Sequence, residues 1–218
     1  MSNLSEHREI KRPPRDMIQR LKDFSVPELC DGAGLFHAMD YRIKPQTGRE
    51  KIVGPAVTVD VPAGEGGIVA DAILCLQDGD VLVVAGHGYC GCSYWGDHRS
   101  FCAKKMKAAG VVIDGAMRDL EECEEIGLPV YAKAVTCGTA GKSGIGAINV
   151  TVNCAEVTVS PGDIIAGDVN GVCVIRPDEA EGIMERALKK RELQKKVREE
   201  MERSSTVLPS LKIVQKNL

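Results

Sequence analysis

"VVIDGAMRDLEE", residues 111–122, joins an apolar run to a cluster of charged residues. The run 111–116 is typical of a buried strand, and the residues from Asp119 to Ile126, ended by Gly127, are typical of a helix. Similar segments lie on either side: strands at 81–86 and 129–135 and a helix at 98–109. This β-α-β-α-β order predicts an α/β domain, in which ligands bind beyond the carboxyl ends of the strands.

The remaining segments carry further element patterns. We expect short helices at 16–24 and 26–34, a strand at 51–61, a helix at 67–77, a glycine-rich loop at 86–97, strands and turns between 147 and 175, and a long charged helix from 177 to about 203. Asn170-Gly171 is typical of a hairpin turn. Since neither a repeat nor a linker interrupts the pattern, we predict a single domain at 14–203 with flanking N- and C-terminal helices, between tails at 1–13 and 204–218.

Composition limits the classes of function. The chain has 218 residues, of which 44% are hydrophobic and 27% are charged, as in soluble globular domains. The net charge is −3 and the basic residues are spread along the chain, whereas nucleic-acid binding needs a concentrated basic surface. No apolar run approaches the roughly 18 residues of a membrane span, and the first residues lack a signal-peptide pattern. We therefore expect a cytoplasmic protein that binds neither nucleic acid nor membranes.

The chain contains nine cysteines, most of them in apolar runs, so we expect reduced and buried thiols. A metal site is the alternative for four residues that lie close together in sequence: Cys90, Cys92, His98 and Cys102. Zinc sites more often combine a C-x2–4-C pair with a second ligand pair, and the C-x-C spacing here departs from that pattern. The role of Cys90 and Cys92 stays open.

The charged stretch from Arg118 to Glu122 allows two interpretations. Asp119 is a favoured N-cap residue, and Glu122 at the third helical position completes a pattern of the capping-box type. Helix capping therefore explains the acidic residues without any function. It does not explain Arg118, because a guanidinium gains nothing from the helix dipole at an N-terminus. Arg118 is better explained by an anion bound at that point.

A second stretch, "WGDHRSFCAKK" at 95–105, opens a helix after the glycine-rich segment. The free N–H groups of a first helical turn bind anions, although an ordinary surface loop with Asp97 as N-cap is the alternative. Since one helix and one strand separate Asp97 from Arg118, both return to the same edge of the sheet. Clustered carboxylates suit a hard ion such as Mg²⁺, and Arg with N–H groups suits a substrate carboxylate. Together they indicate a 2-oxo acid whose carbonyl is polarised by the metal.

These residues form the pattern D-x20-R-D-x2-E through Asp97, Arg118, Asp119 and Glu122, flanked by "GDVLVV" and "VTVSPGDIIAGDVNGVCVI". The pattern resembles the RraA-like family, which includes the 4-hydroxy-4-methyl-2-oxoglutarate / 4-carboxy-4-hydroxy-2-oxoadipate aldolases and the ribonuclease E inhibitor. The resemblance covers residues 20–190 and implies a compact α/β domain resembling the swivelling phosphohistidine-domain (β/β/α) fold. It also implies homotrimers or hexamers with the site at a subunit interface.

The resemblance implies a role for each motif residue. The backbone N–H groups of Gly96, Asp97, His98 and Arg99 and the side chain of Arg118 would hold the pyruvate part of the substrate. Asp119 would ligate Mg²⁺, Mn²⁺ or another divalent cation directly, and Asp97 and Glu122 would hold metal-bound waters. A carboxylate from the C-terminal helix of a neighbouring subunit would join them, with Glu192 as the candidate and Glu199 as the alternative.

The resemblance further implies a metal-dependent (class II) aldolase, a carbon–carbon lyase that releases pyruvate and also decarboxylates oxaloacetate. In this chain Arg118 and Asp97 would be the catalytic pair. The alternative, of a different class, is a non-catalytic regulator that binds a ribonuclease through its surface. The segment "GHGYCGCSYWG" departs from the glycine and aliphatic residues usual in the family, so the second half of the substrate stays open.

Overall fold

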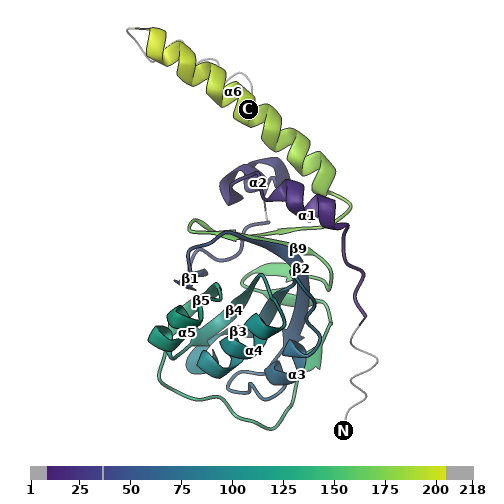
Figure 1. Ribbon diagram of the computed structural model, residues 1–218, viewed down its shortest axis with the longest axis vertical. Helices are drawn as coiled ribbons and strands as arrows, with labels where there is room; N and C mark the ends of the chain where they lie inside the picture. Colours follow the sequence, from purple (N-terminus) through teal and green to yellow (C-terminus); the bar gives the residue numbers. More distant parts are fainter. Residues whose placement is uncertain (1–8, 36, 205–218) are drawn as a thin grey trace.

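The computed structural model describes residues 9–35 and 37–204, and Figure 1 shows a sheet domain from which one long helix projects. The helices are α1 (Arg15–Leu21), α2 (Val26–Ala33), α3 (Val69–Ile73), α4 (Asp97–Lys105), α5 (Leu120–Ile126) and α6 (Ala180–Arg203). The strands are β1 (Lys44–Thr47), β2 (Ile52–Asp60), β3 (Val81–Trp95), β4 (Gly110–Met117), β5 (Val130–Val135), β6 (Ala147–Ile148), β7 (Val152–Cys154), β8 (Val157–Val159), β9 (Ile164–Asp168) and β10 (Gly171–Ile175).

The main sheet has the strand order β1-β5-β4-β3-β2-β9-β10, with β6 paired to β2. Strands β2, β3, β4 and β5 are parallel, and antiparallel strands complete both edges. The predicted α/β class and the central β-α-β-α-β order are confirmed. The likeness to the phosphohistidine-domain fold and the limits of the domain remain predictions.

Helices pack on one face of the sheet, and the β7–β8 hairpin packs on the other. Along β3, Leu82 and Val84 face a core shared with α3, α4 and α5, whereas Val81 and Val83 face the β7–β8 hairpin. This alternation follows from the two-residue period of a strand. Because α4 and α5 follow β3 and β4 directly, their N-termini lie at the carboxyl ends of two neighbouring strands (Figure 1).

The predicted glycine-rich loop at 86–97 is wrong, because β3 continues to Trp95. Its pairing with β4 shifts register between Val84 and Trp95, so bulges absorb the extra residues. A Cβ atom on Gly86 or Gly115 would lie within 2.7 Å or 2.6 Å of the Tyr94 ring. These glycines therefore accommodate a buried aromatic ring, whereas from sequence they indicate a flexible loop.

Other predicted elements are present, but two helices are shorter than predicted. Helix α3 is shorter than the predicted 67–77, because the bonds after it are of the tighter i to i+3 type, such as Leu74 N–H to the Asp71 carbonyl at 3.1 Å. Helix α4 ends early because Lys107 has a left-handed φ of 59°. The hairpin at Asn170 is confirmed as the β9–β10 connection. Strand β1 is an element that sequence analysis missed.

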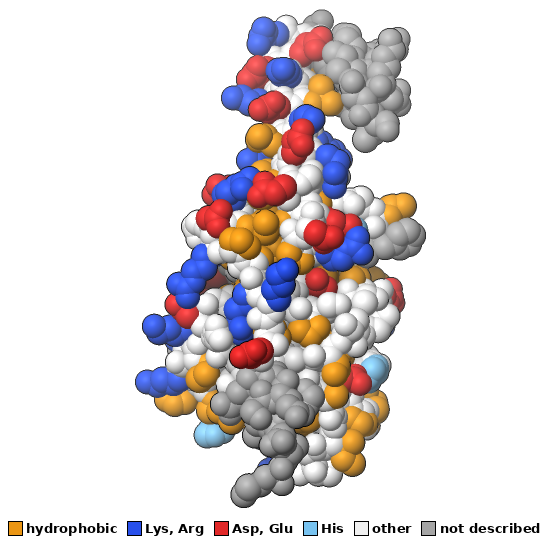
Figure 2. All heavy atoms as spheres, turned by 90° about the vertical axis from the view of Figure 1, so that its right-hand side faces the viewer, with side chains coloured by type: hydrophobic (Ala, Val, Ile, Leu, Met, Phe, Trp, Pro, Cys, Tyr) orange, Lys and Arg blue, Asp and Glu red, His pale blue; other side chains and the backbone are white. Residues whose placement is uncertain are grey.

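Helix α6 joins the domain through its first turns. Ile183, Met184 and Ala187 are buried in a core with α2, and Arg191 donates to both carboxylate oxygens of Glu28 at 2.5 Å and 2.9 Å. Beyond this contact α6 projects away from the sheet (Figure 1), and Figure 2 shows acidic and basic side chains mixed along it. Among the residues that the structure describes, no helix is both long and apolar enough to cross a bilayer.

The N-terminal segment also contacts the domain. In the described part of the predicted tail, Arg12 donates to the buried carboxylate of Asp80 at 2.9 Å and 2.7 Å. Ile10 packs against the core on the helix-covered face. Residues 1–8 and the tail after Ser204 lie outside the described residues.

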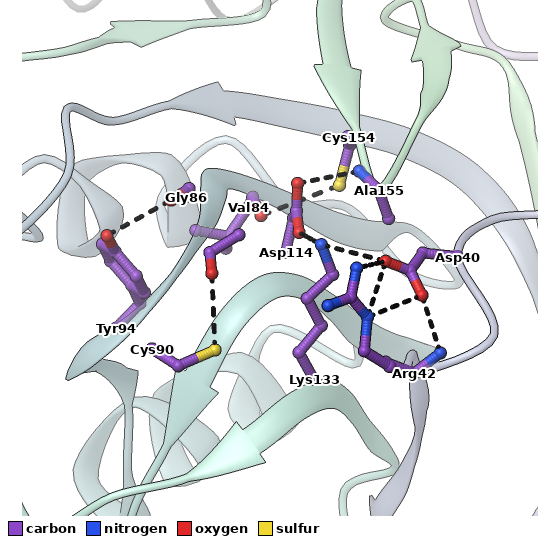
Figure 3. Close-up of polar contacts among 11 residues, drawn as sticks. Asp40, Arg42, Val84, Gly86, Cys90, Tyr94, Asp114, Lys133, Cys154 and Ala155 are labelled. Atoms are coloured by element: carbon purple, nitrogen blue, oxygen red, sulfur yellow. Dashed lines mark hydrogen bonds and ion pairs between the residues drawn. The ribbon is translucent and has the colours of Figure 1, made fainter.

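A buried ion network lies on the opposite face of the sheet, below the β7–β8 hairpin (Figure 3). Lys133 is 2.5 Å from Asp114 and 3.3 Å from Asp40, and Asp114 also accepts from the Ala155 N–H at 2.8 Å. Burial opposes the charge of Lys133, but hydrogen bonding to Asp114 and the charges of both carboxylates outweigh it and raise the pKa of Lys133. The Arg42 side chain, and Lys133 more weakly, lower the pKa of Asp40. The network thus holds the Asp114 carboxylate in the position where it accepts from the hairpin backbone at Ala155.

Removing the central cation should destabilise the domain. Lys133→Met leaves the Asp114 carboxylate buried without its cation, and breaking a buried pair on one side costs about 3–5 kcal/mol. We expect a decrease of this size in the free energy of unfolding, measured by urea titration. The control is Lys189→Met, whose pair with Glu185 is exposed (71% and 68%) and should change stability by less than about 1 kcal/mol. Equal losses in the two variants would contradict a structural role for the network.

The stability contributed by the α2–α6 contact should depend on pH. Hydrogen bonding to Arg191, and more weakly to Ser25, lowers the pKa of Glu28 from 4.5 to about 2. A carboxyl whose pKa is lowered by folding stabilises the fold above its unfolded pKa and loses that effect as pH falls through the folded value. At pH 7 the free energy of unfolding of wild type, measured by urea titration, should therefore exceed that of Glu28→Gln by about 1–2 kcal/mol. The difference should decrease as the pH falls from 4.5 to 2. A difference that does not vary with pH would contradict this assignment.

Candidate active site

The predicted site residues converge on one cleft beside the carboxyl ends of β3 and β4. The cleft has a volume of about 620 Å³ and lies between α3, the first turn of α4 and the segment 139–144. Its lining includes the predicted residues Gly96, Asp97, His98, Arg99, Arg118 and Asp119. The predicted convergence of two sequence stretches at one edge of the sheet is therefore present in the structure.

The first wall of the cleft is the N-terminus of α4. Gly96 is the N-cap residue, in an extended conformation, and Asp97 is the first helical residue. The alternative with Asp97 as N-cap is therefore wrong, and no side chain caps the helix. The first N–H groups of a helix lack intrahelical acceptors. In the cleft they are available to a ligand carboxylate, with the helix dipole favouring negative charge.

The second wall is the Arg118-Asp119 pair. Asp119 occupies the N-cap position of α5 with φ 58° and ψ 51°, a left-handed conformation, and its side chain forms no capping hydrogen bond. Its Oδ2 atom instead accepts from the Arg118 Nε at 3.1 Å. The capping-box interpretation is therefore wrong at this helix. The unusual backbone turns the Asp119 carboxylate toward α4, and such conformations cluster at functional sites.

Gly96 lets these two walls approach closely. A Cβ atom at this position would be 2.4 Å from Asp119 Oδ2 and 3.4 Å from Arg118 Cγ. The Asp119 carboxylate thus lies against the backbone at the start of α4. The Arg118 side chain is 43% exposed and that of Asp119 is 31% exposed, so both remain accessible from the cleft.

The Arg99 side chain supports the cleft wall. It donates to the Gly66 carbonyl at 2.7 Å and to the Tyr94 carbonyl, which joins α4 to the end of β3 and to the segment before α3. Burial, followed by the charge of Arg118, lowers the pKa of Arg99. The predicted role of Arg99 concerned only its backbone N–H group, so sequence analysis missed this structural role of the guanidinium.

Three predicted carboxylates lie elsewhere. Glu122 lines an adjoining cleft of about 660 Å³, which it shares with Asp97 and Phe101. Glu192 is exposed on α6, which projects from the opposite end of the domain (Figure 1), and Glu199 lies 3.8 Å from Arg203 on the same helix. Within one chain, then, α6 brings no carboxylate to the cleft, and the contribution of Glu192 or Glu199 from a neighbouring subunit remains a prediction.

The cleft contains the donor types that a hydrated divalent ion uses. Within residues 9–35 and 37–204, no group of three or more His, Cys, Asp or Glu side chains forms a metal cage, and this includes the cysteine cluster considered above. Mg²⁺ is usually bound through one or two carboxylates and retains several waters. The oxygens of Asp119 and Asp97 beside the cleft fit such an ion, and Arg118 lies next to them.

Sequence analysis missed the far side of the cleft. Asp71, Ser93, Thr139 and Lys142 also line it. Isolated bridges, Ser93 with Thr139 and Glu65 with Gly141, hold the segment 139–144 there. Glu65 accepts from the Ser143 hydroxyl at 2.6 Å, and this bond, with others from backbone N–H groups, lowers the pKa of Glu65 to about 2. No local sequence pattern predicts these contacts, because they join segments that lie far apart in the sequence.

The sequence of residues 26–174 matches the family model RraA-like, described as Aldolase/RraA. The chain belongs to the RraA-like family. A relative from Halalkalibacterium halodurans, named "Putative 4-hydroxy-4-methyl-2-oxoglutarate aldolase", is 37% identical over 175 residues, which cover 80% of this chain and 83% of the relative. The predicted family resemblance is confirmed.

Two solved structures of RraA-like proteins are similar to this chain. Streptomyces coelicolor RraAS2, described as an unusual member of the RNase ES inhibitor RraA protein family, has a TM-score of 0.78 at 26% identity and covers 87% of this chain and 99% of its own. The RNA-processing inhibitor RraA from Thermus thermophilis has a TM-score of 0.65 at 27% identity, covering 70% and 93%. Relatives with this fold therefore carry names from two classes of function.

The close contact between Gly96 and Asp119 should not tolerate a larger side chain in this RraA-like chain. Gly96→Ala places a methyl group 2.4 Å from Asp119 Oδ2, so the carboxylate and the start of α4 must separate. Overpacking of this kind costs about 1–3 kcal/mol. We expect a matching decrease in the free energy of unfolding, measured by urea titration. Gly182→Ala is the control, because it lies in α6 near only the flexible end of Arg186 and should be neutral or stabilising. Unchanged stability in Gly96→Ala would contradict the close packing.

Proposed function

We propose that the protein is a divalent-metal-dependent aldolase that releases pyruvate from 4-hydroxy-2-oxo acids such as 4-hydroxy-4-methyl-2-oxoglutarate. One observation carries the proposal: Arg118 and Asp119 are held side by side against the first turn of α4, with the Asp119 carboxylate freed from helix capping. A guanidinium, free N–H groups and a carboxylate then surround one point. That combination suits a 2-oxo acid with its carboxylate and carbonyl bound side by side.

In this proposal each residue has a separate task. Arg118 binds the substrate carboxylate through its planar fork, and the N–H groups of residues 96–99 bind the same pyruvate half. Asp119 would hold Mg²⁺ or Mn²⁺ directly, and Asp97 and Glu122 would hold it through water. When bound, the ion acts as a Lewis acid on the 2-oxo group. Glu192, or Glu199, would reach the site from a neighbouring subunit of a homotrimer or hexamer.

Retro-aldol cleavage also requires the 4-hydroxyl group to lose its proton. Asp97 lines both the main cleft and the adjoining one, so a water or hydroxyl group between them lies within its reach. In the proposed reaction Asp97 accepts the proton, directly or through water, as general base. The bond between carbons 3 and 4 breaks, and its electron pair moves toward the 2-oxo group of the pyruvate half. Oxaloacetate would reach the same state by losing CO₂, so decarboxylation should accompany cleavage.

The second candidate is a non-catalytic regulator of a ribonuclease. The names of the two solved RraA relatives favour it. Such a protein would bind its partner through its outer surface and would not need the cleft. In this chain all motif positions, Asp97, Arg118, Asp119 and Glu122, are retained, which supports the enzyme. We place either activity in the cytoplasm, in line with the sequence prediction.

A pyruvate-release assay separates the two candidates. The panel contains 4-hydroxy-2-oxo acids and oxaloacetate, each with Mg²⁺ or Mn²⁺ and after exhaustive chelation with EDTA. We expect release only with metal, and we expect Asp119→Asn to abolish it while thermal unfolding changes little, because only a carboxylate suits the proposed direct ligand. Full activity after chelation, or in Asp119→Asn, would falsify the metal-dependent mechanism. No release from any substrate would favour the regulator.

Arg118→Lys provides the sharper test of substrate binding. Lysine keeps the charge but cannot reproduce the bidentate fork. We expect a loss of about 2–4 kcal/mol in transition-state stabilisation, which corresponds to about 30- to 1000-fold in kcat/KM. Arg15→Lys is the control, because its side chain is 89% exposed and lies outside the cleft. A variant within about threefold of wild type at saturating Mg²⁺ would refute the role of Arg118.

A further inference from the structure

Three buried side chains connect the elements that form the cleft. Trp95 ends β3, Ser100 lies in α4 and Cys123 lies in α5, and their exposed fractions are 1%, 0% and 0%. The Trp95 Nε1–H donates to the Ser100 hydroxyl at 2.7 Å, and that hydroxyl donates to Cys123 Sγ at 3.4 Å. The Cys123 thiol in turn donates to the Arg118 carbonyl at 3.7 Å. A chain of hydrogen bonds thus runs from the core to the substrate-binding arginine.

The chemistry of the groups sets the direction of this chain. An indole N–H can only donate, so it must occupy an acceptor position on Ser100. The single proton of the Ser100 hydroxyl is then free for Cys123, and the thiol proton for the Arg118 carbonyl.

Backbone hydrogen bonds close the chain into a ring. The Arg118 N–H donates to the Trp95 carbonyl at 3.0 Å, and the Ser100 N–H donates to the Gly96 carbonyl at 3.0 Å. The main chain of Arg118 is therefore held on both sides, its N–H by β3 and its carbonyl by Cys123. Since Asp119 follows in a left-handed conformation, the orientation of the peptide between them sets where both side chains lie.

We infer that Ser100 is a positioning residue for Arg118 and Asp119, acting through Cys123. Its hydroxyl accepts from Trp95 and donates to Cys123, and the Cys123 thiol donates to the Arg118 carbonyl. Without it, the Cys123 thiol that donates to the Arg118 carbonyl loses the bond that orients it, and the guanidinium is less well placed for the carboxylate of a 2-oxo acid. This inference rests on the proposed function, because it concerns the binding of pyruvate by Arg118.

The test uses three variants of the full chain, loaded with Mn²⁺. Ser100→Ala removes the central hydroxyl, Cys123→Ala removes only the last link, and Cys123→Ser restores a donor at that position. Trp95 is the only tryptophan and lines the main cleft, so its fluorescence provides a label-free probe of pyruvate binding there. The control is Cys154→Ala, a buried thiol that donates to the Val84 carbonyl at 3.8 Å on the opposite face of the sheet (Figure 3).

We expect Ser100→Ala and Cys123→Ala to weaken pyruvate binding about 3- to 10-fold, the effect of one hydrogen bond. Cys123→Ser should return to within about twofold of wild type. Cys154→Ala should lose thermal stability without any change in pyruvate affinity. In an Arg118→Lys background, Ser100→Ala should cause no further loss, because residues that act through one another are not additive.

Each other outcome has a definite meaning. Losses of stability alone in Ser100→Ala and Cys123→Ala, with wild-type pyruvate affinity and release, overturn the positioning role and leave the proposed function intact. Independent, multiplying losses in the Arg118→Lys background overturn it as well. A wild-type protein that neither binds nor releases pyruvate overturns both proposals together. If Ser100→Ala does not fold, the comparison of Cys123→Ala with Cys123→Ser decides the question.

Discussion

The parallel register between β3 and β4 determines the geometry of the cleft. Trp95 at the end of β3 lies opposite Met117 at the end of β4, so the chain leaves the two strands at adjacent points. One exit leads through Gly96 into α4, and the other leads through Arg118 and Asp119 into α5. The rest of the site depends on this pairing, because a slip of one residue in a strand would turn every side chain to the other face.

Charges are separated between the two faces of the sheet. On the helix-covered face, Arg118 and Asp119 form a partly exposed pair beside the cleft. On the opposite face, Lys133 joins Asp114 and Asp40 in a buried network under the hairpin. Buried charges of this kind hold a structure in one arrangement only when all of them are paired. In the cleft the charges of Arg118 and Asp119 remain accessible, so these side chains are able to contact a ligand.

Membership in the RraA-like family leaves two classes of function to separate, because one fold serves relatives with different names. The catalysis proposed above draws its support from the cleft, since a regulator acting through its surface has no need for a left-handed Asp119 or for a glycine next to its carboxylate. Helix α6 adds a further constraint. It projects from the domain with Glu192 exposed, so any carboxylate that it supplies must serve a different subunit.

The sequence by itself determined the order of the central elements, the family and the chemical types at the site, because these depend on local periodicity and on motif spacing. Strand β4, helix α5 and the D-x20-R-D-x2-E pattern were all readable in that way. Tertiary structure alone decided the continuation of β3 through 86–95, where the Tyr94 ring, packed on Gly86 and Gly115, gives the glycines a role opposite to the flexible one that they suggest in sequence. It also decided whether the Asp119 side chain caps α5, since that depends on the φ of Asp119 and on its contact with Gly96, neither of which the sequence gives. The far wall at 139–144 and the ring through Ser100 could not be predicted from the sequence, because they arise from contacts between distant segments that no local pattern encodes.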